Sequence, residues 1–251
     1  MSVRRRLDDA QVARVLALLK EEAGAGRPGK DDRNFIEAVL WWHRTGVPWR
    51  DLPTEFGPWS TVFNRFDRWA KKGKWKQLFE GLKTDVDREW HSLDSTVNRA
   101  HQHAAGGKGG PETQAIGRSR GGATTKVHLV VDALGLPDEF EVTVGQRHDS
   151  QPAPALIEKV KPNQLLCDKA YDSNEIRTQL KDLEARAVIP SKKNRKQPAE
   201  FDSEKYKARS EVECTFNLLK QCRRFATRYE KTARNYAAVV AIGCALLWLR
   251  I

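Results

Sequence analysis

The sequence predicts an α+β or α/β chain in two parts: an all-helical region, then a mixed sheet flanked by helices. Apolar residues recur at helical spacing through about the first third of the chain. After residue 90, short β-branched runs alternate with segments of helical spacing, and turns rich in glycine and proline separate them. The 251 residues suffice for one large or two small domains, and we place the boundaries at 1–85 and 86–251.

The first part contains three predicted helices. Asp8 can cap the first, and the second runs past Phe35 to Thr45-Gly46. The third follows Phe56-Gly57 and has an apolar stripe of Trp59, Val62, Phe63, Phe66 and Trp69. Its opposite face carries Ser60, Asn64, Arg65 and Arg68. Helix, tight turn and polar helix fit a helix-turn-helix that reads DNA, and they fit an ordinary packing unit equally well.

The second part has the strand and helix order of a ribonuclease H-like fold. A strand-rich region begins at Ser92-Leu93-Asp94, and a mobile basic loop is predicted over 106–122. The other predicted elements are a hairpin of Lys126–Val131 and Glu139–Val144, a helix Pro154–Lys161, a buried strand Leu165–Cys167, a helix capped by Ser173 and a strand Ala187–Ile189. A basic loop, SKKNRKQP at 191–198, leads to a helix that carries Tyr206.

Positive charge indicates a polyanionic partner. The net charge is +11, and residues 192–234 hold 13 Lys/Arg against 6 Asp/Glu, a net of +7. The four cysteines show neither a CxxC pair nor zinc spacing, which is typical of reduced core residues in a cytosolic protein. The start of the chain lacks a signal-peptide pattern, and the apolar stretch 237–251 is too short to span a membrane comfortably.

The most informative pattern is the set Tyr206, Arg209, Glu213 and Lys220. Steps of three, four and seven residues place all four on one helical face. One acid among an aromatic residue and two cations suits a metal-binding carboxylate held against phosphates. Glu211 lies about 200° around the helix from Glu213, so we favour Glu213.

Two aspartates complete a predicted triad with Glu213. Asp94 and Asp168 each end an apolar strand-like run, and these two strands are neighbours in the expected sheet. Carboxylate oxygens are ligands that Mg²⁺ prefers, and two ions can share such acids. Other acids suggest structural roles: Asp132 in a hairpin turn, Asp149 and Asp172 at helix caps. Metal-dependent phosphoryl transfer on DNA is therefore the predicted chemistry.

The spacing Y-x₂-R-x₃-E-x₆-K from Tyr206 to Lys220 resembles the YREK signature of DDE insertion-sequence transposases. The runs DSTVNRAHQHAAGGKGG, IGRSRGGATTKVHLVVDALGLP, GQRHDSQ, DKAYDS and NLLKQCRRFATRYEKTARNY resemble those of the insertion-sequence-five group. The helical part, with FIEAVLWWHRTGVPWRDLP and GPWSTVFNRFDRWAKKGKW, is similar to the DNA-binding region of that group. The chain departs at Cys214 and Thr215, where the family more often has an arginine and a second aromatic residue.

The resemblance implies a bacterial transposase of the cytoplasm and nucleoid. It would bind the double-stranded terminal inverted repeats, pair two ends in a homodimer, cleave with Mg²⁺ (or Mn²⁺) and join 3′ ends to target DNA. Asp94, Asp168 and Glu213 would hold the metal, and Tyr206, Arg209 and Lys220 would hold the end DNA. We predict further DNA contacts by Arg118, Arg120, Lys192, Lys193, Arg195, Arg223 and Arg224, besides Ser60, Asn64, Arg65 and Arg68.

Two other functions fit parts of the sequence. A transposase relic that acts as a repressor would bind DNA without cutting it, and the expected sign is loss of an acid. A ribonuclease H-like nuclease would cut by structure and would not need the helical part to read a sequence.

Overall fold

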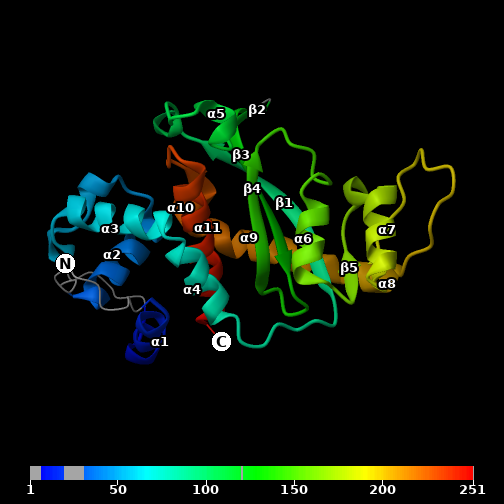
Figure 1. Cartoon of the computed structure of the whole chain (residues 1–251), viewed down its shortest axis with the longest axis horizontal. Helices are drawn as coiled ribbons and strands as arrows, with labels where there is room; N and C mark the ends of the chain where they lie inside the picture. Colours follow the sequence, from blue (N-terminus) through cyan, green and yellow to red (C-terminus); the bar gives the residue numbers. More distant parts are fainter. Residues whose placement is uncertain (1–6, 20–30, 120, 251) are drawn as a thin grey trace.

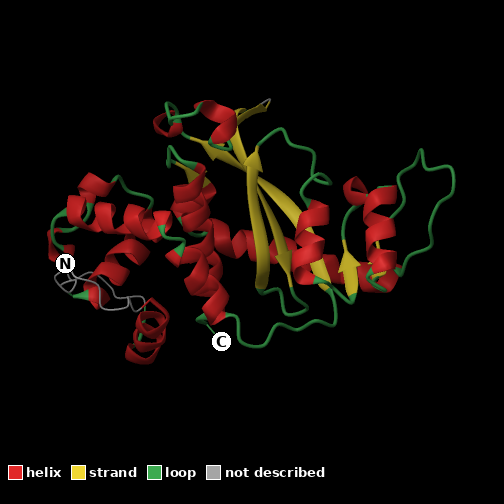
Figure 2. Ribbon diagram, viewed as in Figure 1, coloured by secondary structure: helices red, strands yellow, loops and turns green. Residues whose placement is uncertain are grey.

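A computed structural model describes residues 7–19, 31–119 and 121–250. The first part is helical, as predicted: α1 (Asp9–Leu19), α2 (Asp32–Thr45), α3 (Trp59–Lys71) and α4 (Lys74–Leu82). These helices form one end of the molecule, and the sheet occupies its middle (Figure 1, Figure 2). The link between α2 and α3 is longer than the tight turn we predicted, because two short 3-10 helices, Trp49–Asp51 and Thr54–Phe56, lie within it.

Local signals set the ends of these helices. Asp8 and Gln11 form a capping box, since the backbone N–H of each donates to the side chain of the other. Gly46 ends α2 with a φ of 72°, in the left-handed region that glycine adopts without strain. A Cβ at Gly46 would also lie 2.8 Å from Cβ of Arg223, so this glycine permits close contact between α2 and the C-terminal segment.

The sheet has a central order of β4-β3-β1-β5-β6, which is the ribonuclease H-like arrangement. Its strands are β1 (His91–Ala100), β3 (Gly122–Val131), β4 (Pro137–Val144), β5 (Gln164–Leu166) and β6 (Arg186–Val188). β3 is antiparallel to β1 and β4, whereas β5 and β6 continue the sheet in parallel with β1. Two short strands, β2 (Gly117–Ser119) and β7 (Thr227–Arg228), pair with β3 and β1.

Helices cover both faces of the sheet. On one face α6 (Ala153–Val160) and α7 (Asn174–Asp182) pack with Leu93 and Val130 in a small apolar cluster. On the other face lie α9 (Ser210–Lys220), α10 (Arg223–Ala226) and α11 (Ala233–Trp248). Because side chains alternate along β1, Leu93 and Ser95 point to the α6 side while Asp94 points to the α9 side.

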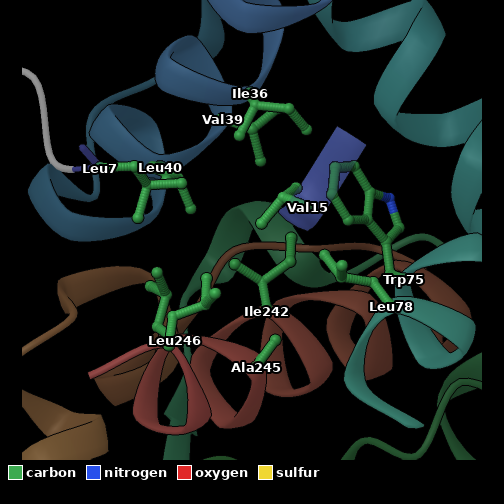
Figure 3. Close-up of a pocket in the computed structure, with 11 residues that line it drawn as sticks. Leu7, Val15, Ile36, Val39, Leu40, Trp75, Leu78, Ile242, Ala245 and Leu246 are labelled. Carbon is green, nitrogen blue, oxygen red and sulfur yellow. The ribbon is translucent and has the colours of Figure 1, made fainter. Parts of the chain in front are cut away.

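The helical region and the sheet share one hydrophobic core. α11 lies between them (Figure 1), and its buried residues belong to the same apolar cluster as those of α1, α2 and α4. Figure 3 shows a small pocket at this junction, where Val15, Ile36, Trp75 and Leu78 surround Ile242 of α11. None of the described helices is both long and apolar enough to cross a membrane. The predicted boundary near residue 85 therefore does not divide two separately packed cores.

Three sequence predictions about local structure are corrected. Asp94 lies within a ten-residue strand and does not end it, because Ser95 to Arg99 continue the pairing with β3. Part of the predicted mobile loop is ordered as helix α5 (Gly110–Thr113) and β2. The Tyr206 helix is broken into α8 (Ser203–Tyr206), a 3-10 turn over Lys207–Arg209, and α9.

Candidate active site

α9 is fixed against the β3–β4 turn. The hydroxyl of Thr215 donates to the carbonyl of Gly135 at 2.6 Å, and Asp132 holds that turn by accepting the N–H groups of Leu134 and Leu136. Asp132 thus has the turn role that its sequence context predicts. Val212, Phe216 and Leu219 are buried beneath the helix. This packing turns the opposite face of α9, with Glu213, outward.

Asp94 and Glu213 are joined through one arginine. Arg209 donates from Nη1 to Oδ2 of Asp94 at 3.0 Å and from Nη2 to Oε1 of Glu213 at 2.5 Å. The guanidinium also lies 5.7 Å from the ring of Tyr206. Glu211 points elsewhere, because its Oε2 would be 3.4 Å from a Cβ at Gly135 in the β3–β4 turn. Residues 115 positions apart in the sequence therefore meet at one point.

The charges around Asp94 shift its pKa. Burial raises the pKa of Asp94, and the negative charges of Asp168 and Glu213 act in the same direction. The N–H of Ser95, which donates to Oδ1 at 2.7 Å, and the charge of Arg209 partly offset this. The charges of Asp168 and Glu213 therefore both reach Asp94, which Arg209 contacts.

Asp168 follows β5, next to β1 in the sheet. Its Oδ1 accepts the N–H of Ala170 at 2.8 Å, which starts the 3-10 turn Lys169–Tyr171. That turn directs Tyr171 into the core, where the phenol has no hydrogen-bond partner among the described residues. Burial raises the pKa of Tyr171 well above its usual value, and the charges of Asp94, Asp149 and Asp168 raise it further. The phenol is thus buried and unpaired within the apolar cluster on the α6 side of the sheet.

A polar cluster that the sequence analysis missed lies behind Asp94. Asp149 accepts hydrogen bonds from the hydroxyl of Ser95 at 2.6 Å and from Lys126 at 2.8 Å. Lys126 also donates to the carbonyl of Arg147. We predicted that Asp149 caps a helix; instead it binds Ser95, the strand residue next to Asp94. Asp149 and Ser95 lie 54 positions apart in the sequence, and their contact depends on the fold, so no local sequence signal indicates it.

Asp172 organises the basic loop that precedes α8. Its fully buried carboxylate binds Arg177 at 2.7 Å, Arg195 at 2.9 Å and the backbone N–H of Lys192 at 2.8 Å. Ser173, next to it, caps α7 as predicted. Arg195 is consequently tied down, and a second bond joins it to Asn174. Arg195 is half-buried and Lys193 of the same loop is exposed, and their contacts with DNA stay predictions.

Two other predicted DNA contacts form ion pairs and ring contacts within the protein: Arg65 is half-buried and Arg224 is buried. Arg65 forms an ion pair with Asp32, and its guanidinium lies 4.2 Å from the Phe35 ring centroid and 4.7 Å from that of Trp69. Arg224 is 5% exposed and pairs with Glu230 at 3.0 Å. The charge of Arg224 is thus paired in the core and that of half-buried Arg65 is paired with Asp32; contact of either arginine with DNA stays a prediction.

The remaining predicted contacts keep an accessible position. The exposed ones are Ser60, Asn64, Arg68, Arg118, Lys193, Lys220 and Arg223, while Tyr206 and Lys192 are partly exposed. Arg120 lies outside the described residues. Among the described predicted contacts, Arg209 binds two of the carboxylates, and the Tyr206 ring lies beside Arg209. The elements that carry the others extend from α3 at one end of the molecule to the 191–198 loop at the other (Figure 1).

Comparison with known families decides the assignment. The family described as "Transposase DDE domain" matches residues 91–248, and "Putative transposase of IS4/5 family" matches residues 7–79. The chain belongs to the DDE transposase family. The two matched segments correspond to the sheet with its C-terminal helices and to the helical region. The resemblance seen in the sequence motifs is thus confirmed, including the insertion-sequence group.

Individual relatives agree with this assignment. The chain is 39% identical over 129 residues to a "Putative transposase for insertion sequence element IS6501" of Brucella ovis, which covers 51% of this chain and 99% of that protein. It is 36% identical over 110 residues to an uncharacterised protein of Sinorhizobium fredii, covering 44% of this chain and 81% of the other.

Among solved structures, the Mos1 strand transfer complex aligns with a TM-score of 0.33 and 12% identity, over 91% of this chain and 81% of the other. A Mos1 paired-end complex aligns with a TM-score of 0.27 at the same identity, over 91% and 82%. Because these similarities are low, we assign the fold from the strand order of the sheet and not from these alignments.

DDE transposases generally use divalent metal ions, and the donor chemistry here fits such an ion. Asp94, Asp168 and Glu213 offer only carboxylate oxygens, the ligands that Mg²⁺ prefers. As they stand, no three acid, histidine or cysteine side chains of the described residues form a group ready to hold an ion. Arg209 stands between two of the acids.

Proposed function

We propose that this protein is an insertion-sequence transposase that binds the terminal inverted repeats of its element, cleaves there and joins the 3′ ends to target DNA. One observation supports this most strongly. Asp94 and Glu213 both bind Arg209, and the negative charge of Asp168 helps to raise the pKa of Asp94. Asp94, Asp168 and Glu213 would hold Mg²⁺, or Mn²⁺ in its place. Bound magnesium supplies activation of the attacking hydroxyl and charge neutralisation at the leaving oxygen.

The protein's own residues position the reacting DNA. β1 and the β3–β4 turn fix Asp94 and α9, so the carboxylates keep their spacing without help from the DNA. Tyr206 and Arg209 flank the acids on one side, and Lys220 follows two turns along α9. These groups suit the phosphates next to the scissile bond, because an arginine fork and a lysine both bind phosphate oxygens. We also propose that two protomers pair two ends and that the reaction takes place in the bacterial cytoplasm.

The test is a cleavage and joining assay in Mg²⁺ on the DNA that flanks the gene. Wild type should nick at one defined terminus, and Glu213→Gln should bind the same terminus without nicking it, because the substitution removes a metal ligand and no phosphate contact. Retained strand transfer by Glu213→Gln would contradict the proposal. Binding by wild type without cleavage, in Mg²⁺ and in Mn²⁺, would favour the repressor function.

The nuclease alternative needs a test that leaves the core intact. Deletion of residues 1–85 would remove helices α1, α2 and α4, which cover the apolar surface of α11. Surface substitution of Ser60, Asn64 and Arg68 to alanine avoids this, because all three are exposed on α3. The triple variant should lose terminus-specific cutting if α3 reads sequence. A structure-specific nuclease would cut as wild type does.

A further inference from the structure

Arg209 occupies the oxygens that the proposed metal site needs. Its fork takes Oδ2 of Asp94 and Oε1 of Glu213, while Oδ1 of Asp94 accepts the N–H of Ser95. We propose that Arg209 and the divalent ion compete for these carboxylates. A DNA phosphate would bind Arg209 in their place and so leave the carboxylate oxygens free for the metal ion. This inference rests on the proposed function, because it takes the three acids as the metal site.

The electrostatics of the site favour competition. Burial raises the pKa of Asp94, and the negative charges of Asp168 and Glu213 repel its carboxylate and raise the pKa further. Arg209 is the cation that offsets this repulsion; burial opposes its charge, yet Glu213 and Asp94 raise the pKa of Arg209. A divalent ion on the same oxygens would repel the guanidinium. Binding of either cation therefore weakens binding of the other.

The surroundings offer Arg209 a second position. Its side chain is 19% exposed, so it reaches solvent, and Tyr206 provides a ring 5.7 Å away on the same side. A phosphate oxygen pair matches the guanidinium fork as well as a carboxylate does. Once Arg209 binds a phosphate, Asp94 and Glu213 lose their compensating cation and attract the metal ion. By linkage, metal binding must then strengthen DNA binding by the same factor.

Such coupling would have a functional consequence. A transposase that holds its metal tightly without DNA could cut at unintended sites. While Arg209 binds Asp94 and Glu213, metal binding is weak. The site would bind its metal ion tightly only after an end phosphate has bound Arg209. Arg209 would thus act as a positioning residue that couples substrate binding to assembly of the site.

The inference can be tested through metal binding alone. Mn²⁺ binding to the full chain, without DNA, is measured by electron paramagnetic resonance for wild type, Arg209→Gln and Lys220→Gln. Lys220→Gln is the matched control, since it removes one positive charge from α9 and the described structure gives Lys220 no ion pair. Arg209→Gln should bind Mn²⁺ about tenfold more tightly than wild type, and Lys220→Gln should stay within about twofold.

Two further arms complete the experiment. Arg209→Lys keeps the charge but loses the fork, so its affinity should fall between wild type and Arg209→Gln. Saturating duplex from the flanking DNA should raise the Mn²⁺ affinity of wild type, after subtraction of Mn²⁺ bound by DNA alone, and should leave Arg209→Gln nearly unchanged. A circular dichroism melt checks that each variant is folded.

The outcomes separate this inference from the proposed function. Equal or weaker Mn²⁺ binding by folded Arg209→Gln would overturn the competition. Glu213→Gln tests the site itself, because it should weaken Mn²⁺ binding and abolish cleavage whether or not Arg209 competes. If Glu213→Gln behaves as expected and Arg209→Gln does not, the metal site stands and the coupling fails. If Glu213→Gln changes neither property, the site assignment fails first.

Discussion

The junction between the helical region and the sheet, and the outward face of α9, both carry cations but use them in opposite ways. At the junction Arg224 lies 4.4 Å from the Trp42 ring centroid and 4.7 Å from that of Tyr229, and it pairs with buried Glu230. On α9 and in the 3-10 turn before it, the cations face solvent or the carboxylates: Lys220 is exposed, and Arg209 binds Asp94 and Glu213. A net charge of +11 therefore overstates what DNA can contact, because some arginines are part of the core.

Adjacent arginines give the largest expected contrast. Arg224→Ala leaves Glu230 buried without its partner and should lower the free energy of unfolding by about 3–5 kcal/mol. Arg223→Ala, next to it and exposed, should change that energy by less than about 0.5 kcal/mol. Urea unfolding of the two variants measures the difference. Similar values for both would mean that Arg224 is not a core residue, and the contrast between the two regions would fail.

Buried His128 should make the stability of the protein depend on pH. Burial lowers the pKa of His128 to about 4, from an unfolded value near 6.5. Between these values the unfolded chain binds more protons than the folded one, so stability falls as the pH falls from 6.5 towards 4. The loss should reach about 2 kcal/mol at pH 5 and about 3 kcal/mol at pH 4.

The measurement is the free energy of unfolding against pH, for wild type and His128→Gln. Glutamine can keep the contact that Nε2 of His128 makes with the Thr143 hydroxyl at 2.9 Å, but it does not titrate. His128→Gln should therefore show a shallower acid loss, and exposed His148→Gln should follow wild type. An unchanged slope in His128→Gln would show that other groups cause the acid sensitivity.

Two arginines of α3, half-buried Arg65 and exposed Arg68, should show a smaller difference in their effect on stability. Arg65→Ala loses two ring contacts and the pair with Asp32, so it should cost about 1–2 kcal/mol. Arg68→Ala, on the exposed side, should cost less than about 0.5 kcal/mol and should weaken DNA binding more than Arg65→Ala does. Thermal unfolding and a binding titration at one salt concentration decide between them. Stronger loss of DNA binding with Arg65→Ala would restore that residue to the DNA surface.

The smallest expected effect concerns single phosphate contacts. If Lys220 and Arg223 each bind a phosphate, alanine at either position should lower the slope of log K against log salt by about one, with little change in stability. Fluorescence anisotropy with the end duplex between low and moderate salt gives the slope. Wild-type slopes in both variants would place the end DNA elsewhere.

Much of the fold followed from local sequence signals. The Asp8–Gln11 cap, the turn around Gly135 and the apolar runs of β3 and β5 each act over a few residues, so their positions could be predicted. The end of β1 was misplaced because the residues after Asp94 are polar, and their pairing with β3 depends on the sheet. The shared core through α11 was likewise missed, since its packing against α4 joins segments far apart in the sequence.

The candidate site divides in the same way. The choice of Asp94, Asp168 and Glu213 came from motif spacing, and in the structure the charges of Asp168 and Glu213 both act on Asp94. The catalytic role of the three acids stays a prediction. The bridging position of Arg209 and the support of Ser95 by Asp149 could not be predicted, because both depend on how β1, β3 and α9 approach one another. The burial of Arg224 and the ring contacts of half-buried Arg65 could not be predicted for a related reason: helical spacing does not reveal which neighbour covers a polar face.

The central claim is that Asp94, Asp168 and Glu213 carry the chemistry. Single-turnover nicking rates at the element's terminus, in Mg²⁺, test it most directly for Asp94→Asn, Asp168→Asn, Glu213→Gln and the control Glu211→Gln. Each of the first three should lose on the order of 10³-fold or more, because residues that act as a unit fail together. Glu211→Gln, two residues from Glu213 and turned towards Gly135, should keep its rate within about threefold. A fast Glu213→Gln, or a loss confined to Glu211→Gln, would contradict the account.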